Sequence, residues 1–229
     1  DLLGSCGLSP QRSTLRALAL SARTEAASAW ERHFGRALLI VLDSLGRAEP
    51  QGIREAALLC LQELVMHQPS FFVEFAEVVA AKLFELCQAV PKDKRVISAA
   101  DRTLERLLGI VDATRSLEIL LPVMSTSRPP LLQVAMRILP IVLQRLPLEG
   151  VEALLNTVLP GVIAAFGDQS AEVRKAAVFC IVDIYFIVSD EVMTILSKEL
   201  SPSQLKLVMI YISRQQRERD ELASVTNDC

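Results

Sequence analysis

The stretch Val173-Arg174-Lys175-Ala176-Ala177 is the last of four similar segments, and these four segments decide the fold. The other three are Ile53–Ala57 (IREAA), Val96–Ala100 (VISAA) and Leu132–Met136 (LQVAM). Each begins with an aliphatic residue and carries alanine at its fourth position, and their first residues lie 43, 36 and 41 positions apart. Small residues at a fixed place let neighbouring helices approach closely, so the sequence predicts a repeated helical unit.

Outside these segments, apolar residues recur at the spacing of an amphipathic helix through most of the chain. Glycine and proline interrupt the pattern between helices, for example at Pro91, Pro129 and Gly167. A period of about 40–47 residues with two helices per unit is typical of HEAT and armadillo repeats, in which stacked neighbours complete each other's core. We therefore predict an all-α fold, a HEAT-repeat solenoid of about four to five stacked helix pairs with capping helices.

The glycine and proline residues that interrupt the helical pattern also predict the domain organisation. We expect a single repeat domain over residues 1–216 and a polar C-terminal tail over residues 217–229. An opening helix is expected near Pro10–Ala22. The expected repeats are 25–67, 69–109, 112–146 and 148–188, followed by a cap over 190–216.

Composition excludes several classes of protein. The chain has 229 residues, of which 51% are hydrophobic, so intrinsic disorder is excluded for most of it. A net charge of −3 gives no bulk attraction to nucleic acid or to anionic lipid. The longest stretch without a charged residue, Ala153–Gly167, is shorter than the ~20 residues of a membrane span. We expect neither a nucleic-acid partner nor membrane insertion.

The cysteines indicate a reducing compartment. Five cysteines without any C-x-x-C pair fit neither a disulfide framework nor a zinc site. Cys60, Cys87 and Cys180 fall inside apolar helical patterns, so we expect buried, reduced thiols in a cytoplasmic protein. His33 and His67 are the only histidines, and no triad or glycine-rich phosphate loop is recognisable. The prediction is therefore a protein that is not an enzyme and needs no cofactor.

Three blocks of sequence resemble the C-terminal domain of the CLASP proteins, the cytoplasmic-linker-associated proteins that bind microtubules. Specific identities cover about a third of the chain, and the middle, about 90–150, matches only in HEAT character. The blocks are Trp30-Glu-Arg-His33-Phe34 with Leu38-Leu39, Leu45-Gly46, Glu49-Pro50, Ile53-Arg54 and His67-Gln68-Pro69; Val173–Ala176 with Val178-Phe-Cys180 and Val182; and Lys206-Leu207 with Tyr211-Ile212 and Arg214.

The resemblance implies a non-enzymatic, TOG-like interaction domain at microtubules, the spindle and the kinetochore. Such a domain recruits its chain, including in mitosis, by binding plus-end linkers, a kinetochore motor, or cortical and Golgi coiled-coil adaptors. One alternative is a TOG-type domain that binds tubulin directly. Tubulin-binding TOG domains resemble one another in an exposed aromatic in the first turn, which Gly46–Gly52 lacks. Another alternative is a generic HEAT scaffold unrelated to microtubules.

Basic residues gather near the turns that precede the four repeated segments. Turns of successive repeats stack along one edge, so these side chains are candidates for a positive ridge that binds an acidic partner. In a second interpretation, an arginine at this place bonds the preceding turn, as is common in HEAT units. The candidate residues are Arg47, Arg54, Lys92, Lys94, Arg95, Arg128, Arg174 and Lys175.

Other conspicuous residues have structural interpretations. Trp30 is expected to pack against Phe34, and Asp168 to lie in the N-cap region of a helix. Asp183 faces solvent or pairs with a base on a neighbouring unit. Phe71 lies off the apolar face of its helix and is a candidate anchor for a partner, although packing against the preceding repeat is the favoured role. The methionines expected to fill the core are Met124, Met136, Met193 and Met209.

Overall fold

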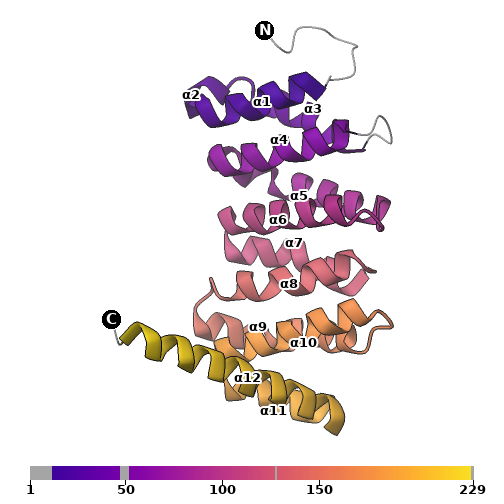
Figure 1. Ribbon diagram of the computed structural model, residues 1–229, viewed down its shortest axis with the longest axis vertical. Helices are drawn as coiled ribbons and strands as arrows, with labels where there is room; N and C mark the ends of the chain where they lie inside the picture. The colour runs from indigo at the N-terminus through magenta and orange to yellow at the C-terminus, as the bar shows by residue number, and fades with distance from the viewer. Residues whose placement is uncertain (1–11, 47–51, 127, 228–229) are drawn as a thin grey trace. The chain divides into compact units, whose positions relative to one another are not determined.

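The computed structural model describes residues 12–46, 52–126 and 128–227, with side chains up to Glu221, and all regular structure in these ranges is helical (Figure 1). The helices form two compact units, one up to Ile119 and one from Leu120, which are described separately. Helix α7, Ala113–Thr126, carries the boundary. The prediction of an all-α fold is confirmed.

The first unit is built from helix pairs. Helix α3 pairs with α4, and α5 pairs with α6, while α4 also packs between α1 and α6. The sequence-predicted opening helix corresponds to α1, whose N-terminal neighbours Pro10 and Gln11 lie outside the described residues. The helices are α1 Arg12–Thr24, α2 Ala27–Trp30, α3 Phe34–Gly46, α4 Ile53–His67, α5 Phe72–Ala89 and α6 Lys94–Ile110, with a 3₁₀ turn at Pro69–Phe71.

Capping side chains and a left-handed glycine mark the N-terminal ends of several helices. The Asp93 carboxylate caps α6 by accepting hydrogen bonds from the backbone N–H of Arg95 (3.1 Å) and Val96 (3.2 Å). Asp112 caps α7 in the same way, accepting from the N–H of Thr114 at 2.9 Å. Gly52 precedes α4 at φ +103°, a left-handed conformation that glycine adopts without a Cβ clash.

The small residues of the repeated segments lie where helices approach each other. Ala57 in α4 and Ala100 in α6 are fully buried, and so is Ala177 in the second unit. These helices pack against α1, α5 and α8 among others, so a larger side chain at these places would force neighbouring backbones apart. The fifth-position alanine of these three segments is thus a packing requirement of the helix pairs; of the fourth-position alanines, Ala56 and Ala135 are buried, while Ala99 and Ala176 are half-buried.

Helix α1 is held on α4 by polar contacts as well as by apolar packing. The Arg23 guanidinium makes a two-pronged ion pair with the Glu63 carboxylate, with both N–O distances 2.6 Å. His67 lies one turn further on, with Nε2 3.3 Å from Glu63 Oε2. The Gln68 amide donates to the backbone carbonyls of Ala22 (3.1 Å) and Glu25 (3.2 Å). The His67-Gln68 pair of the first sequence block therefore fixes the end of α1.

An aromatic cluster joins the first two helix pairs. Phe34 is 2% exposed and packs edge-on against Trp30, with ring centroids 6.4 Å apart. On its other side Phe34 stacks on Phe71 (4.7 Å) and meets Phe72 edge-on (5.1 Å). Trp30 is 5% exposed, so its predicted packing role is confirmed. Phe71 is partly buried and packs against the preceding pair, as the favoured interpretation held.

The second unit is centred on α10, which packs against α8, α9, α11 and α12. Helix α9 is long and apolar enough to cross a membrane, but Leu155, Val158 and Leu159 are buried, and α9 packs against α10. A core helix of a folded domain has the same length and composition. The helices are α8 Leu131–Leu143, α9 Leu148–Phe166, α10 Ala171–Val188, α11 Asp190–Glu199 and α12 Pro202–Asn227.

Helix α12 continues to Asn227, into the polar stretch expected as a tail over residues 217–229. Side-chain pairs one turn apart support the helix as far as Asp220: Arg214 with Glu218 at 3.0 Å, and Gln216 with Asp220 at 2.9 Å. The prediction that Met209 fills the core is wrong, since its side chain is 46% exposed. Met124 and Met136 are buried as predicted, and Met193 is partly buried.

The three cysteines in helices are free and buried, as predicted. Burial raises the pKa of Cys60 to about 12, and the nearby Glu63 charge adds to the effect. Burial likewise raises the pKa of Cys87 to about 12, and it raises the pKa of Cys180 further. These thiols are protonated at neutral pH and serve as small apolar core residues. Cys6 and Cys229 lie outside the described residues.

Candidate partner-binding edges

In the first unit, three cations gather at the turn between α5 and α6. Lys92, Lys94 and Arg95 are all exposed there. Asp93 lies among them, but its carboxylate is engaged in capping the backbone of α6. Among the described residues, neither lysine ammonium group makes an ion pair. This turn therefore presents a compact cationic surface to solvent.

The other two candidate cations of the first unit are Arg54 and Arg47. Arg54 is half-buried, and its Nε donates a hydrogen bond to the backbone carbonyl of Leu45 at 3.3 Å. Its guanidinium thereby ties the start of α4 to the end of α3. Arg47 lies outside the described residues, and so does most of the turn Gly46–Gly52 in which an aromatic side chain was sought.

In the second unit, Arg174 repeats the behaviour of Arg54. Its Nη1 donates to the backbone carbonyls of Asp168 and Gln169, at 2.8 Å each, and so holds the turn before α10. The Asp168 carboxylate accepts from the N–H of Ser170 at 2.7 Å, in agreement with its predicted place in the N-cap region. The arginines Arg54 and Arg174, which follow the first aliphatic residue of their segments, bond the preceding turn in both units.

Arg128 and Lys175 are the remaining candidates, and both are exposed. Arg128 precedes α8 and Lys175 lies in the first turn of α10; these two helices pack side by side. Each unit thus carries exposed cations at the turns that start its second helices. A ridge that runs through all eight candidates stays a prediction.

Sequence reasoning missed two shallow grooves between neighbouring second helices. A groove of about 240 Å³ between α4 and α6 is lined by Leu59 and Arg95 among others. A groove of about 190 Å³ between α8 and α10 is lined by Phe179 and Lys175 among others. Leu59 and Phe179 follow the first aliphatic residue of their segments by six positions, and they are 45% and 40% exposed. An apolar residue at this repeated position, off the main apolar stripe, is the signal that marks both grooves.

Two side chains that line the groove between α8 and α10 also contact α12. Phe179 packs edge-on against Tyr211, with ring centroids 5.3 Å apart. Asp183 accepts a hydrogen bond from the Gln215 amide at 3.4 Å. Burial raises the pKa of Asp183, opposed by this hydrogen bond and by the charge of Arg219. Asp183 therefore bonds an amide on a neighbouring helix, where the sequence analysis expected either solvent or a basic partner.

The described residues contain no group of three or more His, Cys, Asp or Glu side chains that could hold a metal ion. The described sites instead join exposed cations to small apolar grooves. Such surfaces bind other macromolecules through charge and a few apolar anchors.

Comparisons with known proteins identify the family. A HEAT repeat model matches residues 158–188. Over 202 residues, 88% of this chain, the sequence is 30% identical to CLIP-associating protein 1-A of Xenopus laevis. Over 213 residues, 93% of this chain, it is 32% identical to the CLIP-associated protein of Arabidopsis thaliana. The chain spans 14% of the length of each of these relatives.

Solved structures share the fold at low sequence identity. The N-terminal domain of MAST/Orbit superposes with a TM-score of 0.71 at 15% identity, covering 94% of this chain and 95% of that one. A chain from a study of microtubule plus end tracking by XMAP215, CLIP-170 and EB1 gives 0.74 at 15% identity, covering 95% and 88%. A chain from a study of the Crescerin TOG domain array gives 0.68 at 16% identity, covering 89% and 84%.

These likenesses agree with the resemblance drawn from the sequence blocks and with a cytoplasmic, microtubule-associated location. They do not fit a generic HEAT scaffold unrelated to microtubules. The chain is a HEAT-repeat, TOG-like domain of the CLASP, or CLIP-associating, protein family.

Proposed function

We propose that this chain is a non-enzymatic interaction domain that recruits a microtubule-associated protein to plus ends, kinetochores or the cortex by binding adaptor proteins. The observation that carries the proposal is the homology to proteins named for their association with CLIP. That name describes the relatives, and the surface of this chain offers a physical basis for the same kind of binding. The adaptors we propose are plus-end linkers first, then a kinetochore motor and coiled-coil proteins of the cortex or Golgi.

The turn between α5 and α6 is the proposed electrostatic contact. Lys92, Lys94 and Arg95 present three positive charges within four residues. Arg54 and Arg174 contribute to the turns rather than to the partner, because their guanidinium groups bond backbone carbonyls within the chain. An acidic partner segment would approach this turn quickly and with a salt-dependent rate.

The grooves beside these cations supply the proposed apolar contacts. Arg95 lines the same groove as Leu59, and Lys175 lines the same groove as Phe179. A partner helix with an aliphatic anchor followed by acidic residues would satisfy both features at once. Binding energy in such interfaces is concentrated in a few buried anchors, so Leu59 and Phe179 are the proposed anchor sites.

Direct tubulin binding is a second candidate, favoured by the structural likeness to a chain of the Crescerin TOG domain array, which the study describes as regulating microtubules. At 16% identity this likeness shows the fold alone. The turn Gly46–Gly52, which lacks the aromatic side chain of tubulin-binding TOG domains, favours the adaptor role.

Binding to two purified ligands separates the candidates. The full chain is titrated into labelled CLIP protein and, separately, into labelled tubulin, and binding is read by fluorescence anisotropy. The turn variant carries Lys92→Glu, Lys94→Glu and Arg95→Glu. A matched control changes the same net charge elsewhere, at the exposed residues Arg16, Arg32 and Lys198.

We expect the chain to bind CLIP, the turn variant to lose at least about tenfold in affinity, and the control to match wild type within about twofold. Binding of tubulin without CLIP supports the second candidate. Equal loss in the turn variant and the control would remove the turn from the proposed site, and binding to neither ligand overturns both candidates.

A further inference from the structure

Ser98 is exposed on α6, directly after the turn that carries Lys92, Lys94 and Arg95. We call this turn the cationic turn. Arg95 precedes Ser98 by three residues and Lys94 precedes it by four. No other serine or threonine in the sequence has an arginine three positions before it. Protein kinases that select basic segments recognise cations at such positions through acidic side chains of their own.

The helix gathers these charges around the Ser98 hydroxyl. Residues three and four positions apart lie on the same face of an α-helix. Lys94 and Arg95 therefore lie beside Ser98 toward the start of α6. Arg102 lies beside it toward the end of the helix, and its Nη1 donates a hydrogen bond to Ser98 Oγ at 3.1 Å. Three cations thus surround one exposed hydroxyl group.

Two acidic residues lie near this cluster, but on other sides of it. Asp101 is half-buried, and its charge, after burial, raises the pKa of Cys87 in α5 to about 12. Its carboxylate therefore lies toward α5. Glu55 is exposed on α4 and lines the groove that Arg95 also lines. The immediate surroundings of Ser98 on its own helix face are therefore cationic.

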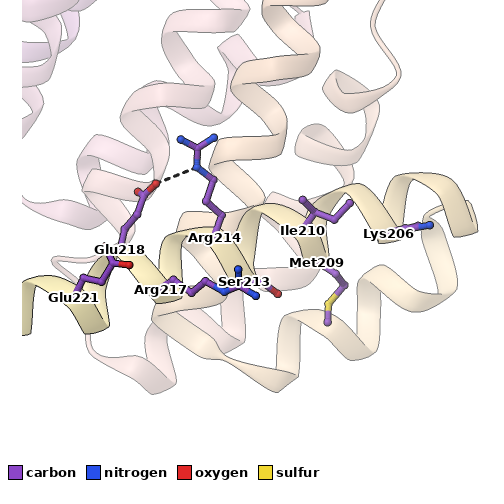
Figure 2. Close-up of a pocket in the computed structure, with 8 residues that line it drawn as sticks. All are labelled: Lys206, Met209, Ile210, Ser213, Arg214, Arg217, Glu218 and Glu221. Carbon is purple, nitrogen blue, oxygen red and sulfur yellow. Dashed lines mark hydrogen bonds and ion pairs between the residues drawn. The ribbon is translucent and has the colours of Figure 1, made fainter.

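Ser213 of α12 shows that this arrangement is particular to Ser98 (Figure 2). Ser213 is also exposed on a helix, and an arginine, Arg217, follows it by four residues. The positions three and four residues before it hold apolar side chains instead, Ile210 and Met209, which line the same surface of α12. Ser213 is therefore a matched control position that lacks the preceding cations.

We propose that Ser98 is a phosphorylation site for a kinase that selects basic segments, and that its phosphate switches off the attraction of the cationic turn for an acidic partner. A phosphoserine carries about −1.5 to −2 charges at neutral pH and accepts hydrogen bonds from arginines such as Arg95 and Arg102. The charge of the turn is then largely neutralised, so an acidic segment loses most of its electrostatic gain. The link to adaptor proteins rests on the proposed function.

The phosphoryl group comes from ATP bound to the kinase. Ser98 Oγ attacks the γ-phosphorus, so that a new O–P bond forms while the bond from this phosphorus to the oxygen that bridges to the β-phosphate breaks. ADP leaves with the bridging oxygen, and the proton of the serine hydroxyl passes to the catalytic base of the kinase. The product is a phosphate ester on the exposed face of α6.

The first turn of α6 must open for this reaction, because a kinase cleft holds its substrate in an extended conformation. The N–H groups of Arg95 and Val96 have no acceptor within the helix and are held by the Asp93 carboxylate. Helix ends open locally at lower cost than helix centres. Opening also uncovers Val96, which is 4% exposed, so we expect slower phosphorylation in the folded chain than in a free peptide.

Phosphorylation in vitro tests the site. The full chain is incubated with ATP and the catalytic subunit of cyclic AMP-dependent protein kinase, and the phosphate is located by mass spectrometry. We expect phosphate at Ser98 and none there in Ser98→Ala. Asp93→Ala removes the cap and raises the rate about fivefold. Asp93→Asn removes the same charge but keeps a good cap, so it raises the rate less than about twofold.

A binding experiment tests the effect of the phosphate. Phosphoserine is incorporated during translation at position 98 or, as the matched control, at position 213. The probe is a labelled peptide of glutamates, titrated at low salt and read by fluorescence anisotropy. We expect phosphate at position 98 to weaken binding at least about tenfold, and phosphate at position 213 to change it less than about twofold.

A folded chain without phosphate at Ser98, under conditions that modify an isolated peptide of residues 90–102, overturns the proposal. Equal weakening by phosphate at both positions overturns it too, as does a glutamate peptide that fails to bind the unmodified chain. Titration with CLIP keeps the proposed function separate. A chain that binds the glutamate peptide but not CLIP contradicts the adaptor role and leaves the phosphorylation switch supported.

Discussion

Replacement of Phe34 by alanine provides the sharpest test of the packing that joins the first helix pairs. The ring is 2% exposed and lies within 4.7–6.4 Å, centroid to centroid, of four other aromatic rings. A buried Phe→Ala change costs about 3–5 kcal/mol, and each aromatic pair contributes about 0.5–1.5 kcal/mol beyond its buried area. Loss of four pairs places Phe34→Ala at the upper end, about 4–5 kcal/mol.

The single tryptophan of the chain makes this measurement local. Trp30 is 5% exposed and packs on Phe34, so its fluorescence reports unfolding of the first unit directly. In urea titrations we expect the midpoint of Trp30 fluorescence to fall by about 1.5–2 M, given a slope of about 2–3 kcal/mol/M for a unit of this size.

Two control variants set the scale. Phe34→Leu keeps most of the buried volume and is expected to cost about 1–2 kcal/mol. Phe179→Ala, at a ring that is 40% exposed in the other unit, is expected to leave the Trp30 transition unchanged. A Phe34→Ala midpoint within about 0.4 M of wild type would refute the reasoning.

Three further predictions concern polar and backbone features. The hydrogen bond from Arg23 holds the pKa of Glu63 below its ordinary value of 4.5, against the opposing effect of burial, so its contribution to stability is present above pH 4.5 and is lost as the pH falls through the lowered pKa. Urea midpoints at pH 7 and pH 3 should therefore differ less in Glu63→Gln than in wild type, and an equal difference contradicts this. Ser189 has φ +51°, so Ser189→Gly is expected to raise the free energy of unfolding of the second unit by about 1 kcal/mol in thermal melts; a lower stability would show that the backbone there is not strained. With pKa values of about 12, Cys60 and Cys87 should be alkylated by iodoacetamide at pH 7.5 only after denaturation, as peptide mapping by mass spectrometry would show; rapid labelling of the native chain speaks against their burial.

The helical architecture was predictable because its causes are local in the sequence. The aliphatic and small residues of the repeated segments identify a helix face that packs closely, and Ala57 and Ala177, at the fifth position of their segments, are fully buried. Breakers such as Pro91 and Gly167 coincide with turns between helices. Hydrophobic periodicity and helix-breaking residues can be recognised without knowing which element packs against a helix. They were therefore enough to predict the helices.

The candidate site was only partly predictable, because the sequence does not show which acceptor a cation meets. Arg54 and Lys94 have the same charge and similar places in their repeats, yet Arg54 reaches the carbonyl of Leu45 and Lys94 is exposed to solvent. Met209 illustrates the same limit for apolar residues. Its place in an apolar pattern marks a helix face, but not whether another element covers that face.

The most direct test of the proposed partner-binding edge is hydrogen–deuterium exchange of the full chain with and without purified CLIP protein. We expect slowed exchange in peptides that cover the turn around Lys92 and Lys94 and the neighbouring groove between α4 and α6. Saturating CLIP that leaves exchange in this turn and groove unchanged, while slowing it elsewhere, would contradict the claim that the exposed cations of the turn carry the interaction.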